Sequence, residues 1–518
     1  MGDWKTVRSV WHATAVALAV FCAVPTPVIA RDASPTCKPV VAHIVSVQGT
    51  VELLRAREKT WAVVQRIGIP VCQGDLLHTG RKSRAALVIP PEKLMRLDQN
   101  STLSITLNAT SEGEVTQVEF FQDERTPKEV LGNSCGSGYF ITRFPRKFKV
   151  LTPYVNAAID GTEFQVTDKC SAGELAVFEG KVTAESVFGA KTFQVQSGQV
   201  LSTGPGEPPA IKVLVKPVDA VQWALYYPPL SAPTFDGEID DACDRAADKR
   251  GCITRRAEQH LRVGRVDDAQ ADIDALLSLD AGDSDAYALA SVISVAKNDK
   301  ASALLRAQQA TERDPANARA WIALSYAQQA HFKLEDALAS AEKAVELNTR
   351  SSTAQARVAE LLMSLGRTRS AERAAQAAVD SNPAESRAHT ILGFVHLTQI
   401  DTKKARADFE AAIERDSSDP LPRLGLGLAM IRQGDLVGGR EQIEIAVILD
   451  PSNSLIRSYV GKAYYEENTS KRDELAATQF GIARQLDPKD PTPWFYDAIL
   501  KQTQNRPVEA LQDLQKSQ

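Results

Sequence analysis

The C-terminal half of this chain repeats itself every 34 residues, and this period is the feature that most constrains its fold. One phase of the repeat carries a small residue in every unit: Ala269, Ala303, Ala337, Ala371, Ala405, Gly439, then Ala476 after a three-residue insertion, and Ala510. A second phase carries Ala310, Ala344, Ala378, Ala412, Ala446 and Ala483. Small residues at fixed phases of a 34-residue period are typical of helical hairpins stacked as a solenoid.

The repeat also predicts where each hairpin begins and ends. Asp-Pro or Asn-Pro steps recur at the unit boundaries: Asp314-Pro315, Asn382-Pro383, Asp450-Pro451 and Asp487-Pro488. Proline donates no amide hydrogen, so each step separates one helix from the next. Residues 250–518 are therefore expected to form about eight helical hairpins. Their predicted starts lie near Arg250, Ser284, Ala318, Ser352, Ser386, Pro420, Ser454 and Pro491.

The helical half resembles the tetratricopeptide repeat (TPR) family. The residues that match its pattern are Trp321, Trp494, Leu392-Gly393, Leu426-Gly427, Tyr464, Phe409 and Phe480. In that family the first helix of each pair lines a concave groove that binds a protein or peptide. The resemblance places nine residues on this inner wall: Arg319, Tyr326, Arg387, Phe394, Leu428, Ile431, Lys462, Tyr465 and Phe495. The alternative is that individual members of this set only complete the core between helices.

The N-terminal half has a different pattern. Between residues 38 and 203, short runs rich in Val, Ile, Thr and Phe alternate with polar residues and end in Gly, Pro or Asp. Alternation over short runs with regular turn signals predicts an all-β domain. Residues 204–249 are rich in proline and glycine and are expected to form a linker. The fold class is thus an all-β domain followed by an all-α solenoid.

The β half resembles the FecR-type periplasmic domain. The matching segments are Val47-Gln48-Gly49, Gln73-Gly74-Asp75-Leu76-Leu77, Val150-Leu151-Thr152-Pro153, Gly161-Thr162-Glu163-Phe164-Gln165-Val166, Val177-Phe178-Glu179-Gly180-Lys181-Val182 and Ser197-Gly198-Gln199. Family members sense or relay signals outside the inner membrane. No membrane span precedes the domain here, so the resemblance implies a periplasmic recognition module rather than direct control of a sigma factor.

These segments also make structural predictions. Gly161 and Gly180 are expected in turns with positive φ angles, which glycine adopts freely. Thr152-Pro153 is expected to end a strand, and Phe164 and Val166 to point into the core from one face of a strand.

The N-terminus predicts export. Residues 1–30 combine Lys5 and Arg8, an apolar run from Ala13 to Val24, and small residues that end at Ala30. This pattern indicates a secretory signal peptide that is removed after Ala30, with a bacterial periplasm as the expected destination. The apolar run is too short for a membrane span.

Cysteine usage agrees with export. Six cysteines follow the signal peptide: Cys37, Cys72, Cys135, Cys170, Cys243 and Cys252. An even number in an exported chain favours disulfides, and sequence alone cannot choose among the possible pairings. Cys243 with Cys252 is the pair that we expect first, because it closes a short loop before the repeats. No cysteine or histidine spacing typical of a metal site occurs.

Charge and motifs narrow the function. Residues 31–220 carry a net charge of +2 and residues 221–518 a net charge of −8, within −5 for the whole chain. An acidic solenoid argues against nucleic acid as its ligand. Phosphate-loop, HExxH and EF-hand patterns are absent, and the Gly/Ser loop around Ser134 has no adjacent histidine that could activate a nucleophile. We therefore expect no enzyme activity and no cofactor.

Two functional hypotheses remain. The first is a non-enzymatic periplasmic scaffold that binds a protein or peptide through the solenoid groove. The alternative is a sensor whose β domain binds a small ligand or an envelope glycan and relays the event to a membrane protein.

Overall fold

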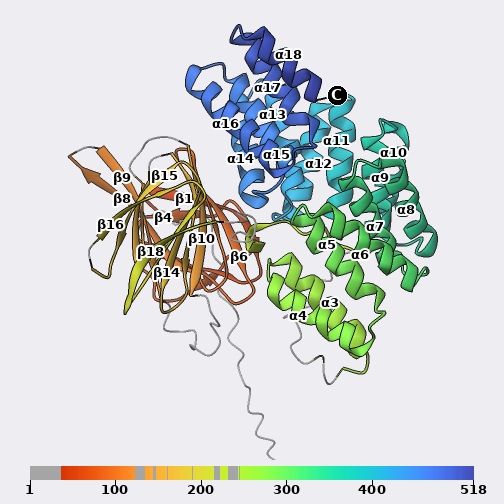
Figure 1. Cartoon of the computed structure of the whole chain (residues 1–518), viewed down its shortest axis with the longest axis horizontal. Coiled ribbons are helices and arrows are strands. Elements are labelled where there is room, and N and C mark those ends of the chain that lie inside the picture. Colours follow the sequence, from red (N-terminus) through yellow and green to blue (C-terminus); the bar gives the residue numbers. More distant parts are fainter. Residues whose placement is uncertain are drawn as a thin grey trace, which may run out of the picture.

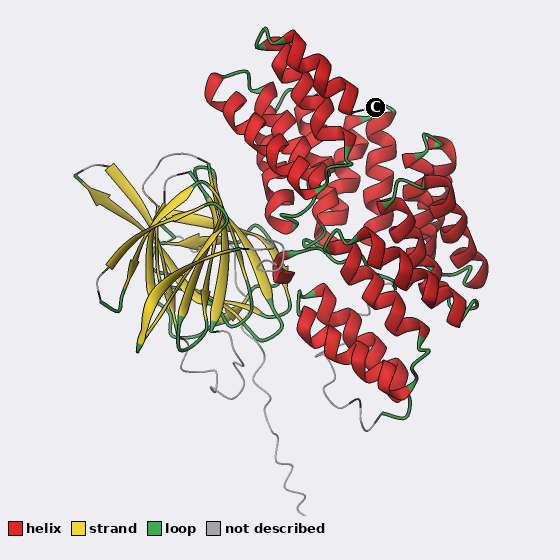
Figure 2. Ribbon diagram, in the orientation of Figure 1, coloured by secondary structure: helices red, strands yellow, loops and turns green. Residues whose placement is uncertain are grey.

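The computed structural model of the chain describes residues 37–111, 113–122, 135–143, 148–159, 161–189, 191–214, 222–231, 243 and 246–517. The predicted signal peptide lies outside these residues. A β-sheet region and a helical array lie side by side, and the chain crosses between them once in the described part (Figure 1; Figure 2). None of the described helices combines the length and apolar character needed to span a membrane.

The β region consists of two nine-stranded sheets. The first has the strand order β18-β17-β14-β13-β10-β7-β6-β1-β4 and the second the order β16-β15-β12-β11-β9-β8-β5-β2-β3. The strands of the first sheet are β1 (Val40–Gln48), β4 (Pro70–Cys72), β6 (Arg84–Ile89), β7 (Lys93–Leu97), β10 (Gly136–Thr142), β13 (Glu163–Asp168), β14 (Gly173–Glu179), β17 (Gln199–Gly204) and β18 (Glu207–Val213). Those of the second are β2 (Val51–Leu54), β3 (Ala62–Val63), β5 (Leu76–Thr79), β8 (Thr102–Thr110), β9 (Gly113–Phe121), β11 (Phe148–Leu151), β12 (Val155–Ile159), β15 (Lys181–Ser186) and β16 (Lys191–Gln196).

Aromatic side chains from both sheets meet in one core. The ring of Phe140 on β10 stacks on Phe164 of β13, with centroids 4.9 Å apart. The same ring lies 5.9 Å from Phe148 on β11 and 6.3 Å from Phe120 on β9, which belong to the other sheet. Offset and edge-to-face aromatic pairs add specificity to the area that they bury. The two sheets therefore pack face to face as a sandwich.

The turn and strand predictions for this domain are confirmed. Gly161 and Gly180 have φ angles of 67° and 79°. Strand β11 ends at Leu151, directly before Thr152 and Pro153. Phe164 and Val166 are both buried, in line with one face of β13 that points into the sandwich.

All six cysteines are within bonding distance of a partner. Cys37 pairs with Cys72 and Cys135 with Cys170, each across 35 positions of sequence. Cys243 pairs with Cys252, the pair expected from the sequence. Disulfides persist mainly in oxidising compartments, so the three pairs are consistent with a protein outside the cytoplasm.

The helical region contains eight antiparallel pairs of helices. Here the first helix of each pair is called the A helix and the second the B helix. The A helices are α3 (Lys249–Arg262), α5 (Ser284–Ala296), α7 (Ala318–Ala330), α9 (Ser352–Ser364), α11 (Ser386–Thr398), α13 (Pro420–Arg432), α15 (Ser454–Glu466) and α17 (Pro491–Thr503). The B helices are α4 (Val266–Leu279), α6 (Lys300–Arg313), α8 (Leu334–Leu347), α10 (Thr368–Ser381), α12 (Thr402–Arg415), α14 (Leu436–Leu449), α16 (Ser470–Leu486) and α18 (Pro507–Lys516). Each A helix begins within one residue of the predicted unit start.

The repeated small residues are the points of closest helix contact. The alanines of both phases are buried, and those from Ala269 to Ala405 have no exposed surface. Gly439 takes the alanine position of α14, where a Cβ atom would lie 2.6 Å from the carbonyl oxygen of Gly427 on α13. Because real Cβ atoms do not approach an oxygen that closely, this pair needs glycine. The three-residue insertion lengthens α16 to 17 residues, against 14 in most B helices.

Gly425 gives a direct test of this packing. A Cβ atom at Gly425 would lie 2.2 Å from the ring of Phe409, which is fully buried between α12 and α13. We expect Gly425→Ala to lower the free energy of unfolding by about 1–3 kcal/mol, because the ring has to move. Chemical denaturation followed by circular dichroism measures this loss.

The matched control is Gly481→Ala on α16, where no atom lies within 4 Å of the added Cβ. Its expected effect is a gain of about 0.5–1 kcal/mol, since alanine has the higher helix propensity. Equal effects of the two substitutions would contradict the account of close helix packing.

Candidate functional site

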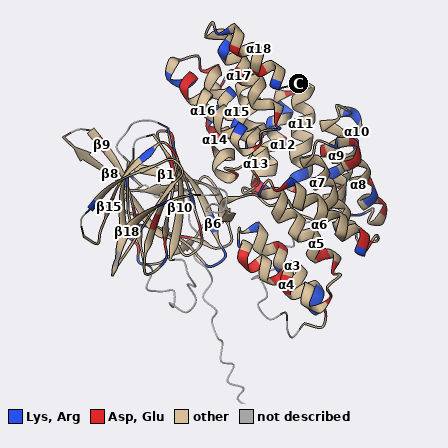
Figure 3. Cartoon of the chain, viewed as in Figure 1, with Lys and Arg blue, Asp and Glu red and all other residues tan. Residues whose placement is uncertain are grey.

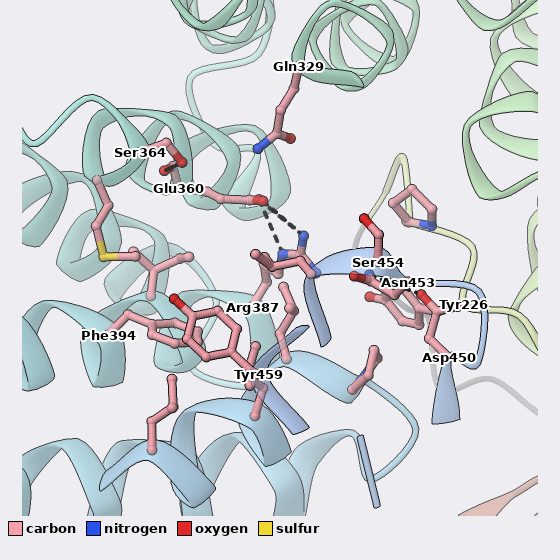
Figure 4. A pocket seen from close by; sticks show the side chains of 18 of the residues that line it. Tyr226, Gln329, Glu360, Ser364, Arg387, Phe394, Asp450, Asn453, Ser454 and Tyr459 are labelled. Carbon is pink, nitrogen blue, oxygen red and sulfur yellow. Dashed lines mark hydrogen bonds and ion pairs between the residues drawn. The ribbon is translucent and has the colours of Figure 1, made fainter. Parts of the chain in front are cut away.

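The A helices α5 to α15 line one large cavity on the inner wall of the solenoid. Its volume is about 1310 Å³, which exceeds the roughly 300–1000 Å³ of sites for small molecules. Figure 4 shows part of this cavity, with Phe394 and Tyr459 toward one end, Arg387 and Glu360 near the middle, and Tyr226 at the other end. The cavity is called the groove below.

One position of the repeat faces the groove in five successive units. The ninth residue of each A helix from α7 to α15 lines it: Tyr326, Glu360, Phe394, Leu428 and Lys462. These residues lie 34 positions apart, so the sequence period aligns them along one wall. The wall combines aromatic, aliphatic and charged side chains. Glu360 was missed in the sequence analysis, although its 34-residue spacing from Tyr326 and Phe394 was a signal that could have found it.

Six of the nine predicted wall residues line the groove, namely Tyr326, Arg387, Phe394, Leu428, Ile431 and Lys462. The other three lie elsewhere. Arg319 lines a separate cavity of about 330 Å³ and pairs with Glu258 and Asp285. Tyr465 packs against the helical core, and Phe495 on α17 is 46% exposed outside the groove.

A buried ion pair lies at the middle of the groove. The guanidinium of Arg387 on α11 contacts both carboxylate oxygens of Glu360 on α9, at 3.1 and 3.2 Å. Burial favours the neutral form of Glu360, but Arg387 and Arg357 outweigh this effect and hold its pKa below the ordinary value. Arg357 also stacks on the ring of Tyr326. Its guanidinium carbon lies 3.8 Å from the ring centroid. The charges at this point of the wall are thus already paired.

The solenoid turns far enough that two distant units touch. Lys300 at the start of α6 forms an ion pair of 2.7 Å with Asp487, which follows α16. The side-chain amide of Asn298 donates a hydrogen bond to the carbonyl oxygen of Leu486 nearby. These contacts join the second and seventh pairs of helices. They close the wall around the groove, which all the intervening A helices line.

The segment between the two domains enters the groove. Tyr226 and Pro228 both line it, and the Tyr226 hydroxyl donates to Asp419 Oδ2 over 3.4 Å. Leu225, Tyr227 and Leu230 are buried in the core instead. The predicted linker therefore includes an ordered part in residues 222–231, and β18 within it pairs with β17.

Buried acidic groups surround this entry point. Asp419 caps the N-terminus of α13 by accepting from the amide of Leu421, and burial raises its pKa from 3.8 to about 6 despite the nearby Arg387. Burial likewise raises the pKa values of Asp98 and Asp450 to about 6. These carboxyl groups lie where the β domain, the segment 222–231 and the helices meet.

The two domains are joined by a buried cluster of charges centred on Glu163 of β13. Arg457 on α15 contacts both Glu163 oxygens, at 2.5 and 2.8 Å. Tyr139 donates its hydroxyl to the same carboxylate, and Arg143 lies 3.3 Å from it. Arg457 outweighs the effect of burial and lowers the Glu163 pKa. This set of Tyr139, Arg143, Glu163 and Arg457 is called the junction cluster.

A second set of contacts lies beside the junction cluster. Glu92, next to β7, pairs with Arg472 at 2.5 Å and with Arg440 at 3.2 Å. Arg96 of β7 donates to the carbonyl oxygens of Ala224 and of Leu449 at the end of α14. These contacts hold the β domain on the edge of the solenoid beside α14. Nothing in the sequence pattern of these arginines distinguishes them from surface residues.

The comparisons with known families agree with this architecture. A family model described as FecR protein matches residues 75–183. A model described as Tetratricopeptide repeat matches residues 358–420 and 396–454. The chain therefore contains a FecR domain followed by TPR repeats. Both kinds of domain are typically non-catalytic, and they suggest a role in protein interaction or signalling.

Solved structures resemble the chain only over part of its length. The Cut9–Hcn1 hetero-tetramer of the APC/C is 18% identical over 54% of this chain and 54% of that chain, with a TM-score of 0.44. The chain thus spans about half the length of this match. A tetratricopeptide repeat protein from Parabacteroides merdae is 19% identical over 47% of this chain and 91% of its own, with a TM-score of 0.33. YrrB, described as a TPR protein with an unusual peptide-binding site, is 22% identical over 36% and 95%, with a TM-score of 0.24. No curated protein matches the chain.

Neither charged side chains nor potential metal ligands gather at one place in the described part of the chain. Figure 3 shows acidic and basic residues interspersed over the helical pairs. Among the residues placed by the structure, no group of three or more His, Cys, Asp or Glu side chains could hold a metal ion.

Glu163→Gln tests the junction cluster. The substitution leaves the buried guanidinium groups of Arg457 and Arg143 without their shared carboxylate, and breaking a buried pair in this way costs about 3–5 kcal/mol. We expect a clear fall in the midpoint of thermal unfolding, with the β domain and the helices unfolding in separate steps. Differential scanning calorimetry measures both effects.

Glu335→Gln is the matched control, because Glu335 pairs with Arg367 at 2.6 Å on the exposed surface. An exposed pair contributes at most about 1 kcal/mol. If the two substitutions shifted the midpoint equally, the junction cluster would not hold the domains together.

Asp419 predicts a pH dependence of stability. Its pKa is higher in the folded chain than in the unfolded chain, so folding favours the protonated form between pH 4 and 6. The free energy of unfolding should therefore rise as the pH falls from 7 to 5, by about 1 kcal/mol for this group. Asp419→Asn should reduce the rise by that amount, while Asp98 and Asp450 preserve the rest.

Asparagine can still cap α13, so this variant isolates the charge. Asp435→Asn is its control, since Asp435 caps α14 from an exposed position. Denaturant titrations at pH 7 and pH 5 give the difference for each protein. An unchanged pH dependence in Asp419→Asn would refute the assignment.

Proposed function

We propose that this chain is an exported, non-enzymatic interaction scaffold whose groove binds an extended segment of a protein partner. The observation that carries the proposal is the groove itself. Five residues of one repeat phase line it, and its volume suits a peptide better than a small molecule. Interfaces draw most of their affinity from a few anchoring side chains that fill well-packed, desolvated recesses.

The lining also indicates what kind of segment the groove accepts. Arg387 is paired with Glu360, and Lys462 is paired with Glu466. The remaining wall is largely apolar, with Phe394, Leu428 and Ile431 available for contact. A partner segment with large apolar side chains suits this surface better than a strongly charged one.

The FecR domain serves in this proposal as a recognition module held against the repeats. The junction cluster and the Glu92 contacts fix its position, so the two domains present one composite surface. The three cysteine pairs and the predicted signal peptide favour the periplasm as the compartment. A disulfide-supported scaffold of this kind would work within an envelope or signalling assembly.

The sensor function remains the second candidate, and the junction cluster is the observation that favours it. A ligand that moves β10 or β13 would alter the contacts of Glu163 with Arg457 on α15, whose other residues line the groove. Such coupling would relay an event in the FecR domain to a partner bound by the helices. A ligand-dependent change in peptide affinity would distinguish a sensor from a passive scaffold.

The groove can be tested with peptides selected from a displayed random library on the mature chain. We expect the selected peptides to bind Leu428→Asp at least tenfold more weakly, because the substitution places a charge on the apolar wall. Fluorescence anisotropy with labelled peptide gives the dissociation constants.

Val437→Asp is the matched control. Val437 lies on α14 of the same helical pair, is 52% exposed and does not line the groove. Its affinity for the peptides should equal that of the unmodified chain. Selected peptides that bind both variants equally well would reject the groove as the binding site.

A further inference from the structure

One end of the groove is already occupied by an extended segment of this chain. Residues 226–229, with the sequence Tyr-Tyr-Pro-Pro, belong to neither a helix nor a strand. They follow the short 3-10 helix Gln222–Ala224, whose Trp223 indole donates to Gln165 of the β domain. The segment therefore reaches the groove from a fixed starting point on the sandwich.

Alternate side chains of the segment point to opposite sides. Tyr226 and Pro228 line the groove, whereas Leu225 and Tyr227 are buried in the core, where the Tyr227 hydroxyl donates to the carbonyl oxygen of Gln222. Alternation of this kind is the property of an extended chain, and adjacent prolines favour it. The segment thus presents a Tyr-x-Pro pattern to the groove, as a bound peptide would.

The tyrosine hydroxyl contacts a buried carboxylate directly beside the groove wall. The Tyr226 hydroxyl lies 3.4 Å from Asp419 Oδ2, and Arg387 Nη1 lies 3.5 Å from the same oxygen. Figure 4 shows Tyr226 beside Asp450 and Asn453 at this end. The carboxylate of Asp419 is a hydrogen-bond acceptor for a phenolic hydroxyl, and Arg387 connects it to the central Glu360 pair.

We propose that Tyr226 and Pro228 are an internal occupant of the groove, and that the partner carries its own extended Tyr-x-Pro segment, which replaces them at Asp419. This inference rests on the proposed function and specifies the peptide class. The occupant is attached to the chain, so its effective concentration at the site is high and a free peptide competes against it. A partner that displaces Tyr226 leaves Leu225, Tyr227 and Leu230 in the core, so the segment need not detach.

The structure shows one hydrogen bond from the Tyr226 hydroxyl, of 3.4 Å to Asp419. An internal occupant that bound tightly would exclude every partner, since the apparent affinity falls with the fraction of chain in which the site is vacant. A tenfold gain in affinity on removing the ring corresponds to a site that is vacant in about a tenth of the molecules. The segment thereby sets a threshold that only a matching peptide overcomes.

The test uses a labelled synthetic peptide, Gly-Ala-Tyr-Ala-Pro-Ala-Gly, with the full mature chain. The peptide keeps the two side chains that face the groove and replaces those that face the core by alanine. We expect it to bind the Tyr226→Ala variant at least tenfold more tightly than the unmodified chain, because the site is then vacant. Fluorescence anisotropy measures both affinities, and circular dichroism checks that the variant is folded.

Two controls locate the effect. Tyr287→Ala removes a tyrosine of α5 that does not line the groove and donates to Ala281, so its affinity for the peptide should match that of the unmodified chain. In Tyr226→Ala with Asp419→Asn, the preference for the tyrosine peptide over its phenylalanine analogue should fall, because the charged acceptor is lost.

The outcomes separate this inference from the function on which it rests. Equal affinity of the peptide for the unmodified chain and for Tyr226→Ala, or no binding to either, would overturn the internal occupant. If library-selected peptides still depended on Leu428 in that case, the groove would remain a peptide site. If no selected peptide depended on Leu428, the proposed function itself would fail.

Discussion

The close approach of A and B helices at alanine and glycine is the constraint on which the rest of the structure depends. Where Gly427 faces Gly439, the two backbones leave no room for a Cβ atom. From Ala269 to Ala405 the same phase carries alanines with no exposed surface. Because the contact recurs every 34 residues, each pair stacks on the next in the same way, and the ninth residues of the A helices line up along one wall. The groove is therefore a consequence of helix spacing.

The buried charges at the junction add a second constraint. Glu163 and Arg457 come from different domains and lie 294 positions apart in the sequence. Both are buried, and two hydrogen bonds join them. Buried pairs are weak evidence for stability, since well-packed apolar residues can often replace them. They do fix orientation, because a bidentate contact is satisfied in only one geometry. The junction cluster thus determines where the FecR domain sits and where the segment with Tyr226 enters the groove.

The local features of this chain were predictable from its sequence, whereas the contacts across domains were not. Periodicity located the A helices to within one residue, and turn chemistry located Gly161 and Gly180, because both depend on near neighbours in the chain. Arg143 shows the limit. It lies in a basic stretch of sequence, yet its side chain is buried between Glu163 and Glu179. The partners of such a residue are set by the fold as a whole, and no local pattern records them.

The central claim is that a peptide enters the groove beside Asp419 and displaces Tyr226. Hydrogen exchange with mass spectrometry of the chain with and without a library-selected peptide tests this most directly. The account predicts slower exchange in α11 and α13 on binding, together with faster exchange around Tyr226 within residues 225–231. Protection confined to the β sandwich or to the B helices, with residues 225–231 unchanged, would contradict it.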